Sequence, residues 1–284
     1  ILAIYGVPVR VWPRAPIKQV LKMDTNSTII KNILEKIDFK ISPDKNIRNL
    51  YTYRIKKKFY KIFNKEKNFI DSITKFKNID ILDVKSLEIL KSLETMSRIS
   101  VGFLINQIAK NLTKDQLYLN IGVWRGFSMF SAMLNTSCFV HGVDDFSHDT
   151  VLRPNPKESN YTKKYFHQNF NKIKVPSRHF FHDIDYLVFF KNFEKENKGI
   201  DFYYYDGDHT FKAQYDNLCI AHNFLKKNSL ILIDDYNETE VQEATQDFIK
   251  KNNKNYKILE IIKTANRFIH PTFANGLILL EKIN

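Results

Sequence analysis

The sequence is poor in cysteine, glycine and proline, and it has no long apolar run. Its two cysteines, Cys138 and Cys219, are too few for a disulfide framework, so we expect buried thiols and a cytoplasmic location. No apolar run approaches the roughly 18 residues of a membrane span, and the first residues lack the layout of a signal peptide. Cys-x-x-Cys, Gly-x-Ser-x-Gly and Walker A patterns are also missing, which argues against zinc, serine-hydrolase and P-loop chemistry.

Positive charge is abundant and unevenly distributed. The formal net charge is +13 at pH 7, and residues 1–95 hold 20 Lys and Arg against 10 Asp and Glu, whereas residues 96–284 hold 24 against 21. Residues 54–67 interleave aromatic side chains with bases, which is typical either of a nucleic-acid or membrane-surface contact or of a helix that packs its aromatic face inward. We favour the packed helix and keep nucleic acid as the alternative.

The chain divides near residue 95. Before it, helical patterns lie between loops at 27–38, 45–66 and 85–95. After it, strand and helix patterns alternate, which predicts a doubly wound, mostly parallel α/β sheet of seven strands with an α-helical N-terminal extension. No helical pattern separates the last two strands, so we expect a terminal hairpin that adds one antiparallel strand. The expected strands are 116–121, 138–144, 177–183, 200–206, 229–235, 256–262 and 276–282, and the expected helices are 96–111, 126–135, 158–171, one ending at Lys227, and 238–252.

Residues 117–126, LYLNIGVWRG, combine a buried-strand pattern with a glycine-bounded turn. Gly122 and Gly126 enclose three residues before a segment with helical spacing. A strand that ends in such a turn and opens a helix brings backbone N–H groups against a nucleotide-like ligand. A dinucleotide fingerprint has a further glycine in the middle, where this chain has Trp124, so the spacing favours a ligand without phosphates.

Polar or acidic side chains follow five expected strands in a row. A single aspartate after a strand is often a helix cap, but capping explains the whole run poorly, and the carboxyl ends of parallel strands form the ligand crevice of an open α/β sheet. Asp144 comes 22 residues after Gly122, about where an acidic side chain accepts hydrogen bonds from ribose hydroxyls. Asp183 is placed to meet the amine of an adenine ring, so the pair indicates an adenosine site. The strand ends carry Asn120, Asp144-Asp145, His182-Asp183, Asp206-Gly207-Asp208-His209 and Asp234-Asp235.

With these motifs in order, residues 116–282 resemble a class I S-adenosylmethionine-dependent methyltransferase. More narrowly, they resemble the small-molecule O-methyltransferase-like family with a strand-end DGDH motif. NIGVWRGFS resembles the first family motif, VHGVDDFS the ribose-binding second, IDFYYYDGDH the fourth-strand motif and LILIDDYN the fifth. The chain departs from the family at Asn120, where an acidic residue is usual, and so loses charge attraction to the ammonium of the ligand. The resemblance implies S-adenosylmethionine bound by Asn120, Gly122, Trp124, Gly126, Ser128, Asp144, Asp183 and Asp206.

The resemblance also implies methyl transfer to a hydroxyl of a small molecule or sugar. His209 is the candidate base, because a neutral imidazole is available at physiological pH, and Asp206 lies three residues before it. In metal-dependent relatives the positions of Asp206, Asp234 and Asp235 hold a divalent ion, and three carboxylates suit Mg²⁺. These aspartates could instead cap helices or bind the acceptor directly.

Residues 1–95 are then a basic helical extension, and residues 96–284 are the methyltransferase domain. We expect the extension to act as a lid, an acceptor platform or a homodimer contact. Two alternatives stay open: an RNA-directed methyltransferase that uses the basic N-terminal region, and a non-catalytic domain that has kept the fold, for which Asn120 is the sequence support.

Overall fold

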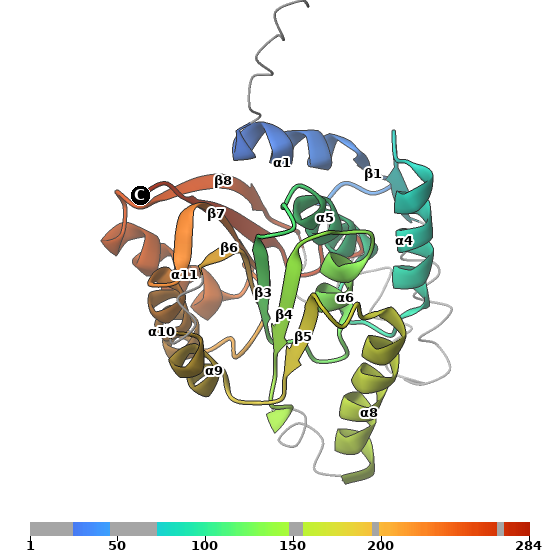
Figure 1. Ribbon diagram of the computed structural model, residues 1–284. Helices are drawn as coiled ribbons and strands as arrows, with labels where there is room; N and C mark the ends of the chain where they lie inside the picture. The colour runs from blue at the N-terminus through green and yellow to red at the C-terminus, as the bar shows by residue number, and fades with distance from the viewer. Residues whose placement is uncertain (1–24, 46–72, 148–155, 195–198, 266–269) are drawn as a thin grey trace, which may run out of the picture.

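The computed structural model describes residues 25–45, 73–147, 156–194, 199–265 and 270–284. Its main sheet has seven strands in the order β5-β4-β3-β6-β7-β9-β8. Strands β3 to β7 pair in parallel, and β9 pairs antiparallel with both β7 and β8. The predicted sheet, including its one antiparallel strand in a terminal hairpin, is confirmed (Figure 1). The strands are β3 (Leu117–Ile121), β4 (Phe139–Val143), β5 (His179–His182), β6 (Ile200–Tyr205), β7 (Leu225–Ile233), β8 (Tyr256–Ile262) and β9 (Leu277–Lys282).

Helices cover both faces of this sheet (Figure 1). Side chains alternate along β6, so Phe202 and Tyr204 pack into the core on the side of α5 and α6, whereas Tyr203 and Tyr205 pack on the side of α9, α10 and α11. All four rings are at most 2% exposed, so the apolar run of β6 is explained by burial on both faces. The helices are α5 (Ile99–Lys110), α6 (Phe127–Met133), α8 (Pro156–Ile173), α9 (Tyr186–Phe193), α10 (Phe211–His222) and α11 (Thr239–Lys251).

The described part of residues 1–95 packs onto the face of the sheet that carries α5 and α6. It comprises α1 (Asn26–Glu35), β1 (Ile37–Phe39), β2 (Thr74–Phe76) and α4 (Ile81–Ser92). Ile30 of α1 and Leu90 of α4 belong to the same hydrophobic core as α5 and α6. The antiparallel pair of β1 and β2 was not predicted, because three-residue strands leave no readable alternation. The expected helix at 45–66 lies outside the described residues apart from Lys45, and the basic segment 54–67 lies wholly outside them.

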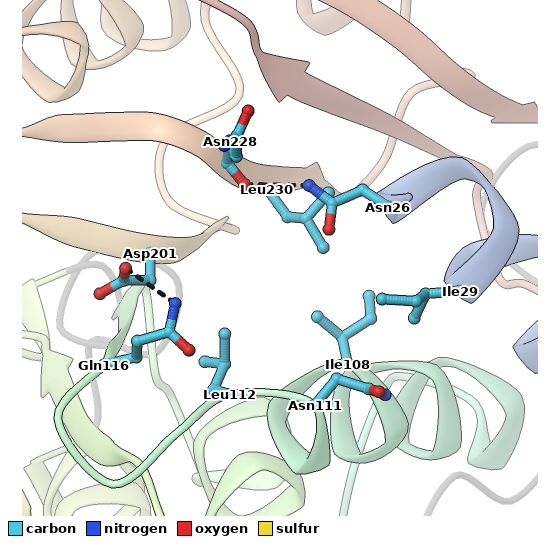
Figure 2. Close-up of a pocket in the computed structure, with 9 residues that line it drawn as sticks. All are labelled: Asn26, Ile29, Ile108, Asn111, Leu112, Gln116, Asp201, Asn228 and Leu230. Atoms are coloured by element: carbon cyan, nitrogen blue, oxygen red, sulfur yellow. Dashed lines mark hydrogen bonds between the residues drawn. The ribbon is translucent and has the colours of Figure 1, made fainter. Parts of the chain in front are cut away.

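A cavity of about 90 Å³ lies where α1 crosses the beginning of the main sheet (Figure 2). Its polar lining is internally paired: the Asn26 amide donates to the Asn228 carbonyl at 2.9 Å and to Glu281 at 2.8 Å. Asp201 accepts from the Gln116 amide at 3.1 Å. Because β3 and β6 begin here, the cavity is at the opposite end of the strands from the predicted site.

Several elements differ from the predictions. The helix expected at 27–38 ends at Glu35, because β1 begins at Ile37, and the helix expected at 85–95 runs from Ile81 to Ser92. Helix α9 occupies residues for which no helix was expected; its sequence YLVFFKNF places Phe189, Phe190 and Phe193 in the core. The helix expected to end at Lys227 ends at His222, and β7 begins at Leu225. Asn228 has a φ of 65° within β7 and lies beside the register shift to β6. This irregularity breaks the strand pattern, so the early start of β7 is not visible in the sequence. No helix among the described residues has both the length and the apolar character to cross a bilayer.

Candidate functional site at the carboxyl ends of the strands

The sheet order reverses between β3 and β6, because β4 and β5 lie to one side and β7 to the other. Such a switch point is where open α/β sheets bind ligands. The polar residues that follow β3, β4, β5, β6 and β7 all lie along this edge, since these strands run in parallel. The topology therefore brings the predicted site residues to one edge of the sheet.

The turn after β3 is held against the end of β6 by a glycine. Gly122 has a φ of 80°, and a Cβ atom on it would lie 1.9 Å from the Asp206 carbonyl oxygen. Gly126 has a φ of 95° at the N-cap of α6. Between them Trp124 has a φ of 47°, a left-handed conformation that is strained for a residue with a Cβ. Only glycine fits at position 122, and the strain at Trp124 requires outside support.

Asp144, which follows β4, fastens this turn. Its Oδ2 accepts the backbone N–H groups of Val123 and Trp124 at 2.8 and 2.7 Å, and its Oδ1 accepts the N–H of Phe146 at 2.7 Å. Burial raises the pKa of the Asp144 carboxyl, whereas the three N–H donors oppose that rise. Oδ1 accepts one of these bonds, so it retains a lone pair for a further donor.

Asn120 lies at the end of β3 and is fully buried. Its amide donates to the Gly122 carbonyl at 3.0 Å, and its oxygen accepts from the Ser128 hydroxyl at 2.7 Å. The side chain thus links the strand, the glycine turn and α6. An aspartate or glutamate could not donate to the Gly122 carbonyl, which gives the unusual asparagine a structural reason.

Asp183, directly after β5, is at the outer side of the site. Its carboxylate pairs with Lys163 of α8 at 2.5 Å, and both side chains are more than a third exposed. The Lys163 ammonium also lies 5.6 Å from the ring centroid of Phe146. Solvent-screened pairs of this kind contribute little to stability, so Asp183 can exchange this partner for another.

His209 lies among three carboxylates. Its Nε2 is 3.6 Å from Asp206 and 3.2 Å from Asp235, and its Nδ1 is 3.3 Å from Glu238. Burial opposes the charge on the imidazole, but the hydrogen bond and charge of Asp206, with Asp235 and Glu238, raise the pKa of His209 to about 10. The three carboxylates thus favour the protonated imidazole, whereas the sequence analysis expected a neutral one, and the role of His209 as base stays a prediction.

Asp234 and Asp235 point to different surroundings. Asp234 is buried and accepts the Tyr204 hydroxyl at 2.5 Å and the Asp235 N–H at 2.9 Å. Burial, with the charges of Asp235 and Asp206, raises the pKa of Asp234 well above its usual range. Burial and Asp206 also raise the pKa of Asp235, to about 7. Asp235 has a φ of 55°, which turns its side chain from that of Asp234.

One cluster of metal-ligand atoms is found in the described part of the chain. Single ligand atoms of Asp206, His209 and Asp235 lie within 4.8 Å of one another. This set shares Asp206 and Asp235 with the predicted three aspartates but contains His209 in place of Asp234. Carboxylate and imidazole donors together suit a divalent cation, so the donor chemistry fits a metal.

Glu238 was missed by the sequence analysis. It is the N-cap residue of α11, and its Oε1 accepts from the Asn275 amide at 3.1 Å. The available signal was its place three residues after Asp235, where a strand-end loop enters a helix. A glutamate at the start of an expected helix does not indicate which side chain it will contact, so its contact with His209 was not expected.

Comparison with known proteins places this geometry in context. Residues 119–236 match a family model described as a methyltransferase domain, and no curated protein matches the sequence. The chain is similar in structure to the O-methyltransferase from Bacillus cereus, crystallised with SAH, with a TM-score of 0.51 and 12% identity over 78% of this chain and 98% of that one. It is also similar to the O-methyltransferase TomG from Streptomyces achromogenes, involved in tomaymycin synthesis and solved with SAM, with a TM-score of 0.51 and 11% identity over 78% and 97% of the chains. At these identities the structural likeness is one of fold.

Proposed function

We propose that this chain, whose residues 119–236 match a family model described as a methyltransferase domain, transfers a methyl group from S-adenosylmethionine to a hydroxyl of a small molecule or sugar. The observation that carries the proposal is the glycine turn at the switch point, held by Asp144 from the neighbouring strand. Such a turn provides a preformed binding surface for an adenosine ligand without phosphates. The O-methyltransferase neighbours with SAH or SAM support the choice of ligand.

Several site residues suit this ligand by their chemistry. Asp144 has a free lone pair for a ribose hydroxyl, and the exposed Asp183 carboxylate can leave Lys163 for the adenine amine. Gly122, Trp124 and Gly126 would shape the backbone beside the amino-acid part of the ligand. Asn120, Ser128 and Asp206 complete the proposed set. The two bonds of Asn120 within the protein indicate that it orients the turn and Ser128 rather than replacing the charge of an acidic residue.

Methyl transfer needs an acceptor oxygen aligned with the methyl group and relieved of its proton. We propose that His209 accepts the proton of the acceptor hydroxyl. It lies in the loop after β6, beside Asp206 and Asp235. The charges of the neighbouring carboxylates raise the pKa of His209 and so favour the protonated ring. A bound acceptor or cation that engages these carboxylates would lower the pKa of His209, so that the ring loses its proton to solvent and its free nitrogen can then take the proton of the acceptor hydroxyl.

For the cation we propose Mg²⁺, held by Asp206 and Asp235, with Asp234 as the third predicted ligand. A bound divalent ion would lower the pKa of an acceptor hydroxyl. The buried Asp234 carboxylate must first give up its bond with Tyr204, whereas His209 is already within the cluster. Comparing Asp234→Asn with His209→Gln in a Mg²⁺ titration of thermal stability separates these two donor sets.

Calorimetric titration with S-adenosylmethionine tests the cofactor. We expect saturable heat with a Kd of roughly 1 μM to 1 mM, the range in which enzyme KM values usually lie, and weaker binding by Asp144→Asn. Asp216→Asn is the matched control, because it removes a carboxylate from an exposed ion pair with Lys212 on α10. The absence of both binding heat and a thermal shift at millimolar ligand would refute the enzyme proposal.

Transfer of a labelled methyl group to a panel of phenols and sugars tests the reaction. His209→Gln should lose transfer and keep S-adenosylmethionine binding, because the imidazole is assigned to the acceptor rather than the cofactor. A transfer rate in this variant within twofold of the wild-type rate would exclude His209 as the base. Transfer rates unaffected by EDTA and by added MgCl₂ would exclude a role for the cation in the reaction.

A further inference from the structure

Arg125 is a buried charge inside the glycine turn. It directly precedes Gly126 and is 8% exposed, and its Nε is buried with no hydrogen-bond partner in the described part of the chain. A buried guanidinium is costly unless other groups compensate for its lost hydration. The turn itself does not require it, since Gly122, Gly126 and Asp144 already set the backbone. Contacts outside the turn must therefore stabilise the buried charge of Arg125.

The compensating groups come from two other segments. Arg125 Nη1 lies 2.5 Å from Oε2 of Glu94, in the connection between α4 and α5. The guanidinium carbon is 5.0 Å from the ring centroid of Tyr161 and 5.9 Å from that of Tyr165, both on α8. Within the turn it lies 4.4 Å from the ring of Trp124. These separations allow cation–π attraction to all three rings.

Glu94 is held in place by the same aromatic residues. Its Oε1 accepts the Tyr161 hydroxyl at 2.8 Å, and its backbone N–H donates to the Tyr165 hydroxyl at 2.7 Å. The network of Glu94, Arg125, Tyr161 and Tyr165 is therefore closed on itself. It ties the end of the N-terminal segment and α8 to a turn whose Trp124 is in a strained backbone conformation.

We infer that Arg125 is a positioning residue, which need not touch a ligand but joins Glu94 and α8 to the glycine turn and so holds the turn in its ligand-ready form. The guanidinium, which lies over the Trp124 ring, restrains Trp124 from one side, and Asp144 restrains the same residue through its backbone N–H. The N-terminal segment thereby acts on the cofactor site through one ion pair. The consequence for binding rests on the proposed function, whereas the consequence for the turn does not.

Backbone hydrogen exchange of the ligand-free chain tests the inference directly. Arg125→Met keeps much of the side-chain length and removes the charge and the planar stack, and Glu94→Gln removes the opposite charge with little change in volume. In both variants we expect faster exchange confined to residues 120–130. Glu35→Gln, which breaks the exposed Lys31–Glu35 pair of α1, is the matched control and should leave exchange unchanged.

Binding of S-adenosylmethionine gives the second readout. Arg125→Met should weaken binding about tenfold, because the ligand must then order a turn that the wild-type chain already holds in place. Arg125→Lys should recover little of the loss, because an ammonium cannot stack as a planar guanidinium does. Unchanged exchange at 120–130, or faster exchange spread evenly over the chain, would overturn the positioning role. If the wild-type chain binds no S-adenosylmethionine, the proposed function fails and the exchange result still decides the role of Arg125.

Discussion

Replacing Gly122 by alanine should destabilise the fold, because it forces β3 and β6 apart where the site forms. The added Cβ would lie 1.9 Å from the Asp206 carbonyl oxygen, against an ordinary carbon–oxygen contact of about 3.3 Å. The two backbones must therefore separate by about 1.4 Å. The bond between Asp206 N–H and the Ile121 carbonyl, 3.0 Å long, lies at that point and would be lost.

The expected magnitude follows from two contributions. A left-handed conformation costs a residue with a Cβ about 1–2 kcal/mol, and a broken buried hydrogen bond costs about 1–3 kcal/mol. Together they predict a loss of about 2–5 kcal/mol in the free energy of unfolding, a large part of the 5–15 kcal/mol typical of a domain. Urea unfolding followed by circular dichroism measures this loss.

Gly199→Ala is the matched control for this substitution. A Cβ there would meet the side-chain carbons of Lys226, which can move, and Gly199 has no left-handed φ. We expect a change below about 1 kcal/mol. If Gly122→Ala is also within about 1 kcal/mol of wild type and binds S-adenosylmethionine normally, the close approach of the turn to β6 does not define the site.

Three other substitutions test the acidic part of the site. Asp144→Asn replaces one acceptor oxygen with a donor that faces backbone N–H groups, so the free energy of unfolding should fall by about 1–3 kcal/mol; a fall below about 0.5 kcal/mol would contradict the role of Asp144 in the turn. Tyr204→Phe deprives the buried Asp234 of a donor and should lower the melting temperature, and an unchanged melting temperature would show that Asp234 does not depend on it. The pKa of His209, about 10 in the folded chain, is above its unfolded value of about 6.5, so its stabilising effect is complete below pH 6.5 and disappears as pH rises through 10. His209→Gln should accordingly destabilise the chain more at pH 6 than at pH 10, and a difference that grows with pH would refute this linkage.

The sequence was sufficient for the sheet because period and order are local properties. The glycine turn after β3 and the acidic ends of β4 to β7 are visible as short motifs, and parallel pairing then brings them together. Helix α9 was missed because its aromatic run has no clear boundary in sequence. The early start of β7 was missed because Lys226 and Lys227 are exposed, and exposed lysines are equally typical of a helix end.

The contacts within the site were less predictable, because they depend on side-chain direction. Asp234 and Asp235 are adjacent and identical, yet one faces Tyr204 and the other His209, and the left-handed backbone at Asp235 separates them. Nothing in the pair DD specifies that division. The partner of Arg125 is 31 residues away at Glu94, so no local pattern could have connected them.

The position of β9 has a consequence for synthesis of the chain on the ribosome. Both neighbours of β9 precede it in sequence, so β7 and β8 emerge before the strand that joins them. Until then β7 presents an unpaired edge of Leu230, Ile231, Leu232 and Ile233, and such edges are prone to pair with other chains. A nascent chain halted before residue 277 should therefore aggregate readily, and release of the last strand should be the event that makes this half of the sheet safe from misassociation.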